Sequence, residues 1–107
     1  TYTNSERRVQ RIRASLPPAG ETKPVWKIVT ELATHMGSTE FNYADASSIF
    51  DDIAQNVENY QGLSFARLDS EFTGVQWPVP DIEHPGTPTL YNDKFLTASG
   101  LAQVTTI

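Results

Sequence analysis

Apolar residues recur at helical spacing through the stretch that follows Pro24. Between Val25 and Met36 they lie three or four residues apart, at Trp26, Val29, Leu32, Ala33 and Met36. Proline is favoured in the first turn of a helix and glycine just beyond its end, where Gly37 stands. The pattern therefore predicts a helix over residues 25–36.

A second helix is predicted from about Ala46 to Val57. Asp45 is a suitable N-cap, because its carboxylate can accept a hydrogen bond from a free N–H of the first turn. The expected buried stripe consists of Ile49, Phe50, Ile53 and Val57. A third and shorter helix is expected after Ser64, between Gly62 and Gly74, with Phe65 and Leu68 pointing inward.

The first sixteen residues allow two interpretations. Asn4 or Ser5 could cap a helix that buries Val9, Ile12 and Leu16. Alternatively, residues 1–3 and 9–13 are extended arms on either side of a turn at residues 4–6. The periodicity alone favours the helix, and we take the extended form as the prediction because of the resemblance described below.

The last third of the chain contains four prolines between Gln76 and Pro88, which forbid a helix there. Two short apolar runs, residues 94–97 and 101–107, then flank Ala98-Ser99-Gly100. This pattern predicts a C-terminal β-hairpin with a glycine turn. The expected fold class is α+β: about three helices, a short N-terminal extended/turn segment and a C-terminal β-hairpin.

Composition limits the chemistry that the chain can perform. Its 107 residues fit one domain with a modest core, and its mean hydropathy of −0.39 is that of an ordinary soluble protein. No apolar run approaches the roughly 20 residues that span a bilayer. The chain has no cysteine, and His35 and His84 are isolated, so we expect no metal ligand and no redox centre of its own.

Charge is distributed unevenly. Residues 1–30 hold six basic and two acidic residues, and residues 31–107 hold two basic and eleven acidic ones, so the segments carry +4 and −9. The arginines of this basic head (Arg7, Arg8, Arg11 and Arg13) could bind a small dianionic ligand such as a nucleotide pyrophosphate. Equally, they could pair with acids on neighbouring elements. The acidic remainder would repel nucleic acid.

No catalytic arrangement is apparent in the residues themselves. Asp51 and Asp52 are adjacent on a predicted helix, where side chains diverge by about 100° and do not converge on one substrate. A second acidic pair, Asp81 and Glu83, lies in the proline-rich stretch. Phosphate-binding glycine loops and nucleophile motifs are missing.

The segment Thr3 to Gln10, TNSERRVQ, resembles the T/G-N-x-E-R-R-x-Q signature of the molybdopterin-dependent oxidoreductases. The resemblance continues in order along the chain and is strongest to the alpha (catalytic) subunit of formate dehydrogenases. Further segments that carry it are Pro18 to Pro24, Trp26 to Gly37, Ile49 to Ile53, Gln76-Trp77-Pro78, His84 to Pro88 and Gly100 to Gln103.

The resemblance implies that the chain is a fragment of such an oxidoreductase. Residues 1–75 would be the helical end of a nucleotide-binding α/β domain, and residues 76–107 a proline-rich connector and hairpin leading toward the C-terminal domain. The parent would hold bis-molybdopterin guanine dinucleotide with molybdenum or tungsten. Asn4, Glu6, Arg7 and Arg8 are the cofactor-binding candidates, and no catalytic residue is assigned. Val25 stands where the family has an aspartate that meets the guanine end of the cofactor.

The expected role is to provide scaffold and part of the cofactor-binding wall, without catalysis or bound cofactor in the isolated chain. The expected partner is the remainder of the catalytic subunit, with no nucleic acid, no membrane and a cytoplasmic location. Self-association through exposed apolar surface is also expected. The alternative is a non-enzymatic interaction module whose basic N-terminal head binds an acidic partner or phosphate ligand.

Overall fold

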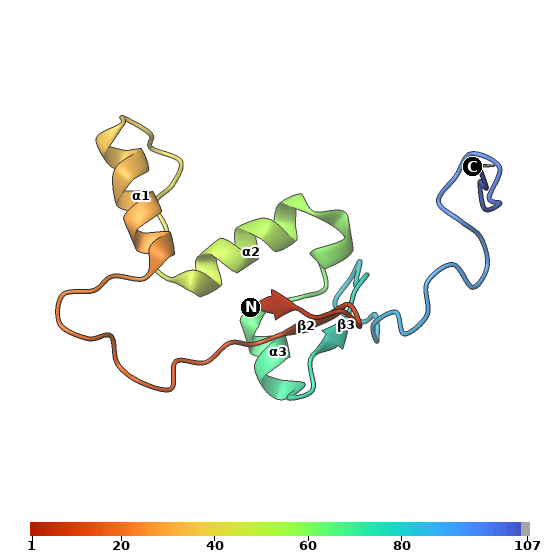
Figure 1. Cartoon of the computed structure of the whole chain (residues 1–107), viewed down its shortest axis with the longest axis horizontal. Coiled ribbons are helices and arrows are strands. Elements are labelled where there is room, and N and C mark those ends of the chain that lie inside the picture. The colour runs from red at the N-terminus through yellow and green to blue at the C-terminus, as the bar shows by residue number, and fades with distance from the viewer. Residues whose placement is uncertain (106–107) are drawn as a thin grey trace.

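Three short strands, three α-helices and one 3-10 turn make up the computed structural model, which describes residues 1–105 (Figure 1). The α+β class is therefore confirmed. The strands form one antiparallel sheet in the order β1-β2-β3. In chain order the elements are β1 (Tyr2–Thr3), β2 (Arg8–Gln10), α1 (Val25–His35), α2 (Ala46–Asn56), η1 (Glu58–Tyr60), α3 (Phe65–Ser70) and β3 (Val75–Gln76).

The N-terminus forms the extended arms and turn, so the extended interpretation is confirmed and the helix is wrong. Strand β1 pairs with β2 in the register Tyr2↔Gln10 and Thr3↔Val9. The Asn4 side-chain oxygen accepts hydrogen bonds from the N–H groups of Glu6 (3.0 Å) and Arg8 (2.9 Å). Asparagine often competes with helix formation in this way, by bonding the backbone just after it.

Strand β3 was not foreseen from the sequence, because it contains only two residues, between Gly74 and Trp77. It pairs with β2 in the register Arg8↔Gln76 and Val9↔Val75. Gly74 precedes it with a φ of 78°. A Cβ atom at Gly74 would lie 2.4 Å from the Val9 carbonyl oxygen, so only glycine allows β2 and the start of β3 to approach this closely.

The core lies where the sheet meets α2 and α3. Partly buried aromatic side chains surround it, and edge-to-face and tilted contacts join Phe50 to Tyr60 and Phe65. The inward positions predicted for the third helix are confirmed for Leu68, which is 1% exposed, while Phe65 packs at the margin. The buried cluster consists of Val9, Phe50, Leu63, Leu68, Val75 and Val79.

Helix α2 begins at the predicted N-cap. The Asp45 carboxylate accepts from the Ser48 N–H (2.8 Å), and the Asp45 N–H donates to the Ser48 hydroxyl oxygen (3.2 Å), which completes a capping box. Its buried face agrees with the prediction at Phe50 only, and the second buried residue is Ala54. Of the predicted stripe, Ile49 is half-buried, and Ile53 and Val57 are 43% and 41% exposed.

Helix α1 forms where predicted. No residue of α1 is buried, and Val25 and Leu32 are among its most open side chains. Figure 1 shows α1 on the side of α2 away from the sheet. The radius of gyration is 17.8 Å, against roughly 13 Å for a compact domain of this length.

The predicted C-terminal hairpin is wrong for residues 94–105, and residues 106 and 107 lie outside the described part of the chain. A turn forms instead, in which the Phe95 N–H donates to the Gly100 carbonyl (2.9 Å) and the Gly100 N–H to Thr97 (3.0 Å). Leu96 and Leu101 remain exposed. Two isolated strands without an apolar surface to cover them are only marginally stable.

Leu68 provides a test of where the core lies. Leu68→Ala should lower the free energy of unfolding by about 3 kcal/mol, because it leaves a cavity among packed side chains. Leu96→Ala, the same change at a residue that is 86% exposed, should lower it by less than about 0.5 kcal/mol. Urea unfolding followed by circular dichroism measures both, and equal losses would place the core elsewhere.

Candidate functional site

The Arg7 side chain joins the N-terminal turn to the proline-rich stretch. Its Nη1 donates to the carbonyls of Trp77 and Thr87 (3.0 Å to Thr87), and its Nη2 donates to the Pro88 carbonyl (2.9 Å). The Arg7 carbonyl in turn accepts from the Trp77 N–H at 2.9 Å. The turn imposes a φ of 63° on Arg7, an uncommon value for a residue with a side chain. Arg7 thus makes four hydrogen bonds with Trp77, Thr87 and Pro88.

Arg67 holds the other half of the proline-rich stretch. From α3, its guanidinium donates to the carbonyls of Gly62 (2.8 Å), Ile82 (3.0 Å) and His84 (2.7 Å), while its Nε pairs with Glu71 (2.9 Å). Prolines offer no N–H, so this stretch cannot close upon itself through a regular ladder. Two arginines supply the missing donors. The sequence predicted no role for Arg67, because its acceptors are backbone carbonyls, which no pattern of side chains reveals.

Asn4, Glu6 and Arg8 surround Arg7 on the same turn. Arg8 donates to the Gly74 carbonyl (3.1 Å), and its Nε lies 3.8 Å from the Glu6 carboxylate, which is largely exposed. The Asn4 oxygen is occupied by the turn, whereas its Nδ2 has no hydrogen-bond partner within residues 1–105. The four predicted cofactor-binding residues are therefore adjacent, and the amide of Asn4 and the carboxylate of Glu6 face outward from the backbone bonds.

Trp77 adds a second unpaired donor beside this turn. Its indole Nε1 is buried and has no acceptor in the part of the chain that is described. A buried donor without a partner is unusual in a native protein and calls for an explanation. The Trp77 side chain also lines an open hollow of about 200 Å³ together with Pro78, Tyr91 and Lys94.

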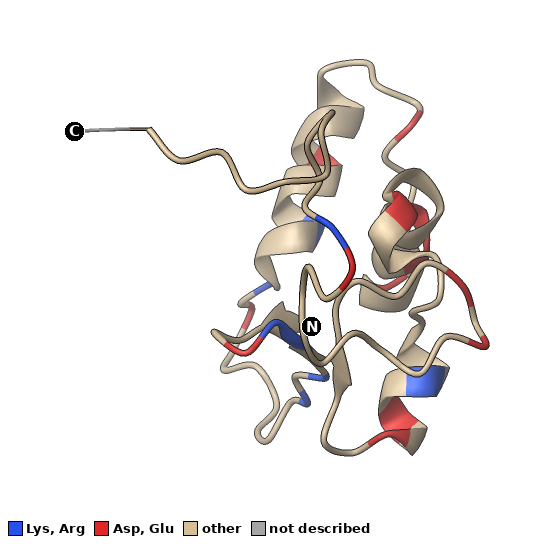
Figure 2. Ribbon diagram, turned by 90° about the vertical axis from the view of Figure 1, so that its right-hand side faces the viewer, with Lys and Arg blue, Asp and Glu red and all other residues tan. Residues whose placement is uncertain are grey.

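The remaining arginines of the basic head pair within the chain. Arg11 and Arg13 both bond the Asp69 carboxylate, at 3.1 and 2.7 Å, and Arg11 also covers the Phe65 ring at 3.7 Å. The hydrogen bond from Arg11 lowers the pKa of Asp69 below its ordinary value. In Figure 2 basic residues gather on the N-terminal strands and their continuation, while acidic ones are spread over helices and loops. The prediction that these arginines pair with acids of neighbouring elements is confirmed, which weighs against a head free to bind an acidic partner.

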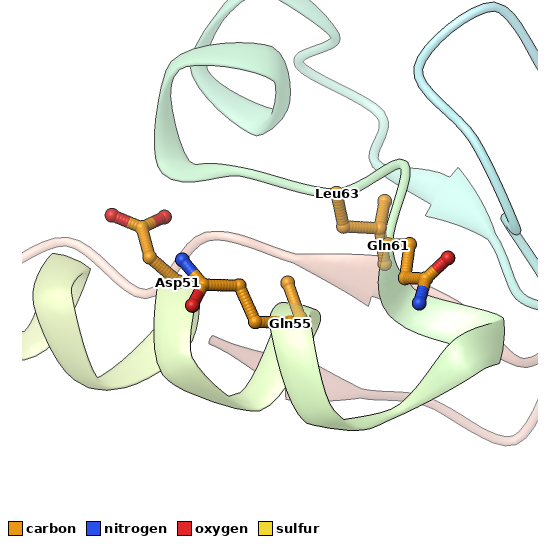
Figure 3. A pocket seen from close by; sticks show the side chains of 5 residues that line it. Asp51, Gln55, Gln61 and Leu63 are labelled. Atoms are coloured by element: carbon orange, nitrogen blue, oxygen red, sulfur yellow. The ribbon is translucent and has the colours of Figure 1, made fainter.

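The paired acids do not form a catalytic dyad. Asp52 accepts hydrogen bonds from the Tyr43 hydroxyl and from the Asn56 amide (3.0 Å), and the bond from Tyr43 raises the pKa of that phenol. Asp51 lies instead at the rim of an open hollow of about 490 Å³. Figure 3 shows the Asp51 carboxylate and the Gln55 amide at one end of this hollow and Gln61 at the other.

Neither a metal nor a membrane element is apparent in residues 1–105. These residues contain no cluster of three or more histidines or acids able to hold a metal ion. Their helices are also too short and too polar for any of them to cross a bilayer.

Sequence comparison identifies relatives of the chain. Residues 1–35 match the molybdopterin oxidoreductase family. Over 108 residues, covering all of this chain, it is 47% identical to the F420-dependent formate dehydrogenase 2 subunit alpha of Methanococcus maripaludis. It is 40% identical over 105 residues to the F420-dependent formate dehydrogenase subunit alpha of Methanocaldococcus jannaschii, and 44% over 107 residues to a putative formate dehydrogenase of Staphylococcus haemolyticus, each match covering 97% of this chain.

These matches confirm the resemblance: the family model covers residues 1–35, and the similarity to formate dehydrogenases extends along nearly the whole chain. They also set its extent, since the chain spans 16%, 15% and 10% of the length of these three relatives.

Arg7 offers a test of how the turn and the proline-rich stretch are held together. Arg7→Lys keeps the charge but cannot reach three carbonyls from one ammonium group. It should cost about 2 kcal/mol and raise the exchange rate of the Thr87 amide, which bonds Gln76, by more than tenfold. Arg13→Lys, at a half-exposed pair, should cost less than about 0.5 kcal/mol. Hydrogen exchange followed by NMR measures both, and equal effects would contradict this role of Arg7.

Proposed function

We propose that the chain is part of the catalytic subunit of a molybdopterin-dependent oxidoreductase that oxidises formate, in which it provides scaffold and one edge of the cofactor-binding wall. The observation that carries the proposal is the identity of 40–47% with formate dehydrogenase alpha subunits over nearly all of the chain.

The N-terminal turn suits a polar, acceptor-rich cofactor. The Asn4 amide and the buried Trp77 indole N–H both lack an acceptor within residues 1–105. The backbone N–H of Trp77 donates to the carbonyl of Arg7, which belongs to the same turn as Asn4. A molybdopterin guanine dinucleotide presents phosphate, carbonyl and ring-nitrogen acceptors that could complete these bonds. When bound, its molybdenum or tungsten supplies the two-electron step by which formate becomes carbon dioxide and a proton.

Within this proposal the four predicted residues have two different roles. Asn4, Glu6 and Arg8 present polar atoms to the cofactor. Arg7 contributes by fixing the turn against the proline-rich stretch, so that those atoms are held in place before the cofactor arrives.

The isolated chain should not oxidise formate, because the proposal assigns the metal ligands to other parts of the subunit. Formate-dependent reduction of a viologen dye, measured with the purified 107-residue chain, should equal the rate in buffer. Turnover by that chain alone would overturn the supporting role.

A chimera tests the cofactor contact. The chain would replace the matching stretch of the Methanococcus maripaludis subunit, and Asn4→Asp would then be introduced. This change keeps the oxygen that shapes the turn but removes the outward donor, so we expect about tenfold less retained molybdopterin, equivalent to one lost hydrogen bond of about 1.4 kcal/mol. Pterin fluorescence after acid release and oxidation measures the retained cofactor independently of activity.

Asn92→Asp is the matched control, since it makes the same change of charge at an exposed residue. The chimera carrying it should retain its molybdopterin. If both variants retained the cofactor equally, Asn4 would not contact it.

A further inference from the structure

Helix α1 carries an apolar face that the described chain leaves open. Val25, Ile28, Leu32 and Met36, which we call the outer face, are between 51% and 79% exposed. At about 100° per residue these four side chains lie on one side of the helix. Lys27 and Thr34 occupy the opposite side, whereas Glu31 and His35 lie along the polar edge next to Ile28.

The chain covers only the neighbouring side of α1. Trp26, Val29 and Thr30 face α2 and the preceding loop across an open hollow of about 270 Å³, lined there by Phe41, Ile49 and Ile53. Trp26 and Val29 together with the outer face form an apolar stripe of roughly 160°, wider than one contact with α2 can cover. An apolar stripe of this width is typical of a helix that packs on two sides.

We propose that the outer face of α1 packs against an apolar surface elsewhere in the same catalytic subunit. The inference rests on the proposed function, which makes the chain part of a larger polypeptide. Helix α1 lies inside the stretch that matches the molybdopterin oxidoreductase family. In the Methanococcus maripaludis relative the matched stretch is 16% of the protein, so about five-sixths of such a subunit is available to cover this face.

Two other occupants fit the surface less well. One 11-residue helix from each of two copies offers too little surface to reach the roughly 1,000 Å² expected of a stable dimer. A lipid surface would require a basic polar side on the helix, yet Lys23 pairs with Glu31 at 2.7 Å, and that pairing lowers the pKa of Glu31. The polar side of α1 is therefore close to neutral.

The chimera described above, the Methanococcus maripaludis subunit carrying this chain, provides the test. Leu32→Asp places a charge on the outer face, and Thr34→Asp places the same charge on the polar side of the same helix. In the chimera, Leu32→Asp should lower the melting temperature by about 5 °C or more and speed amide exchange in α1 at least tenfold, whereas Thr34→Asp should do neither. Leu32→Ala provides a milder variant if the aspartate prevents folding, and should give a smaller shift in the same direction.

The isolated 107-residue chain is the second arm of the experiment. There Leu32 is exposed, so Leu32→Asp and Thr34→Asp should change its melting behaviour equally. A larger loss for Leu32→Asp in the isolated chain would mean that the face belongs to the chain's own core. Sedimentation as a dimer that Leu32→Asp converts to a monomer would identify a second copy as the occupant. Either result overturns the proposal.

The outcomes separate this proposal from the proposed function. A chimera that retains molybdopterin but tolerates Leu32→Asp as well as Thr34→Asp would overturn the interface alone. A chimera that fails to fold before any substitution counts against both.

Discussion

The backbone bonds of Arg7 hold together two segments that cannot form regular structure by themselves. The turn at residues 4–8 is too short for a helix, and the stretch from Trp77 to Pro88 lacks the N–H groups needed for a ladder. One guanidinium joins them across 70 to 81 residues of sequence. Strand β3 pairs with β2 in the same place, so the small core is closed by contacts between the N-terminal segment and residues 75–88.

Arg7 and Asn4 show how the turn combines a structural and a recognition role. The Asn4 oxygen accepts two backbone bonds, which set the turn, while its amide nitrogen points away from them. The Arg7 guanidinium donates to backbone carbonyls, so it holds the turn in place more than it attracts a ligand. A motif shared with the oxidoreductases thus carries structural constraints as well as the proposed contacts. The ion pairs of Arg11 and Arg13 with Asp69 belong to the structural part.

Local signals in the sequence predicted most element boundaries, and long-range packing decided what they could not. Asp45 caps α2 as predicted, and the helix expected after Ser64 is capped by that residue, because capping depends on residues three positions apart. The buried face of α2 was predicted only in part, at Phe50, since periodicity identifies an apolar side but not how much of it is covered. Strand β3 and the contacts of Arg67 escaped prediction because their partners are distant backbone atoms. The hairpin predicted at residues 94–107 had turn chemistry but found no surface on which to pack in the described residues.

Val25 bears both on the open face of α1 and on the resemblance to the oxidoreductases. The resemblance implies an aspartate at this position in the family, and a carboxylate in the first turn would favour the positive end of the helix. Helix α1 has no acidic residue in its first turn, and Val25 is 75% exposed. The valine therefore forgoes that electrostatic gain and extends the apolar face by one turn. An exposed valine gives little stability by itself, so its presence is best explained if this end of α1 is covered in the complete subunit.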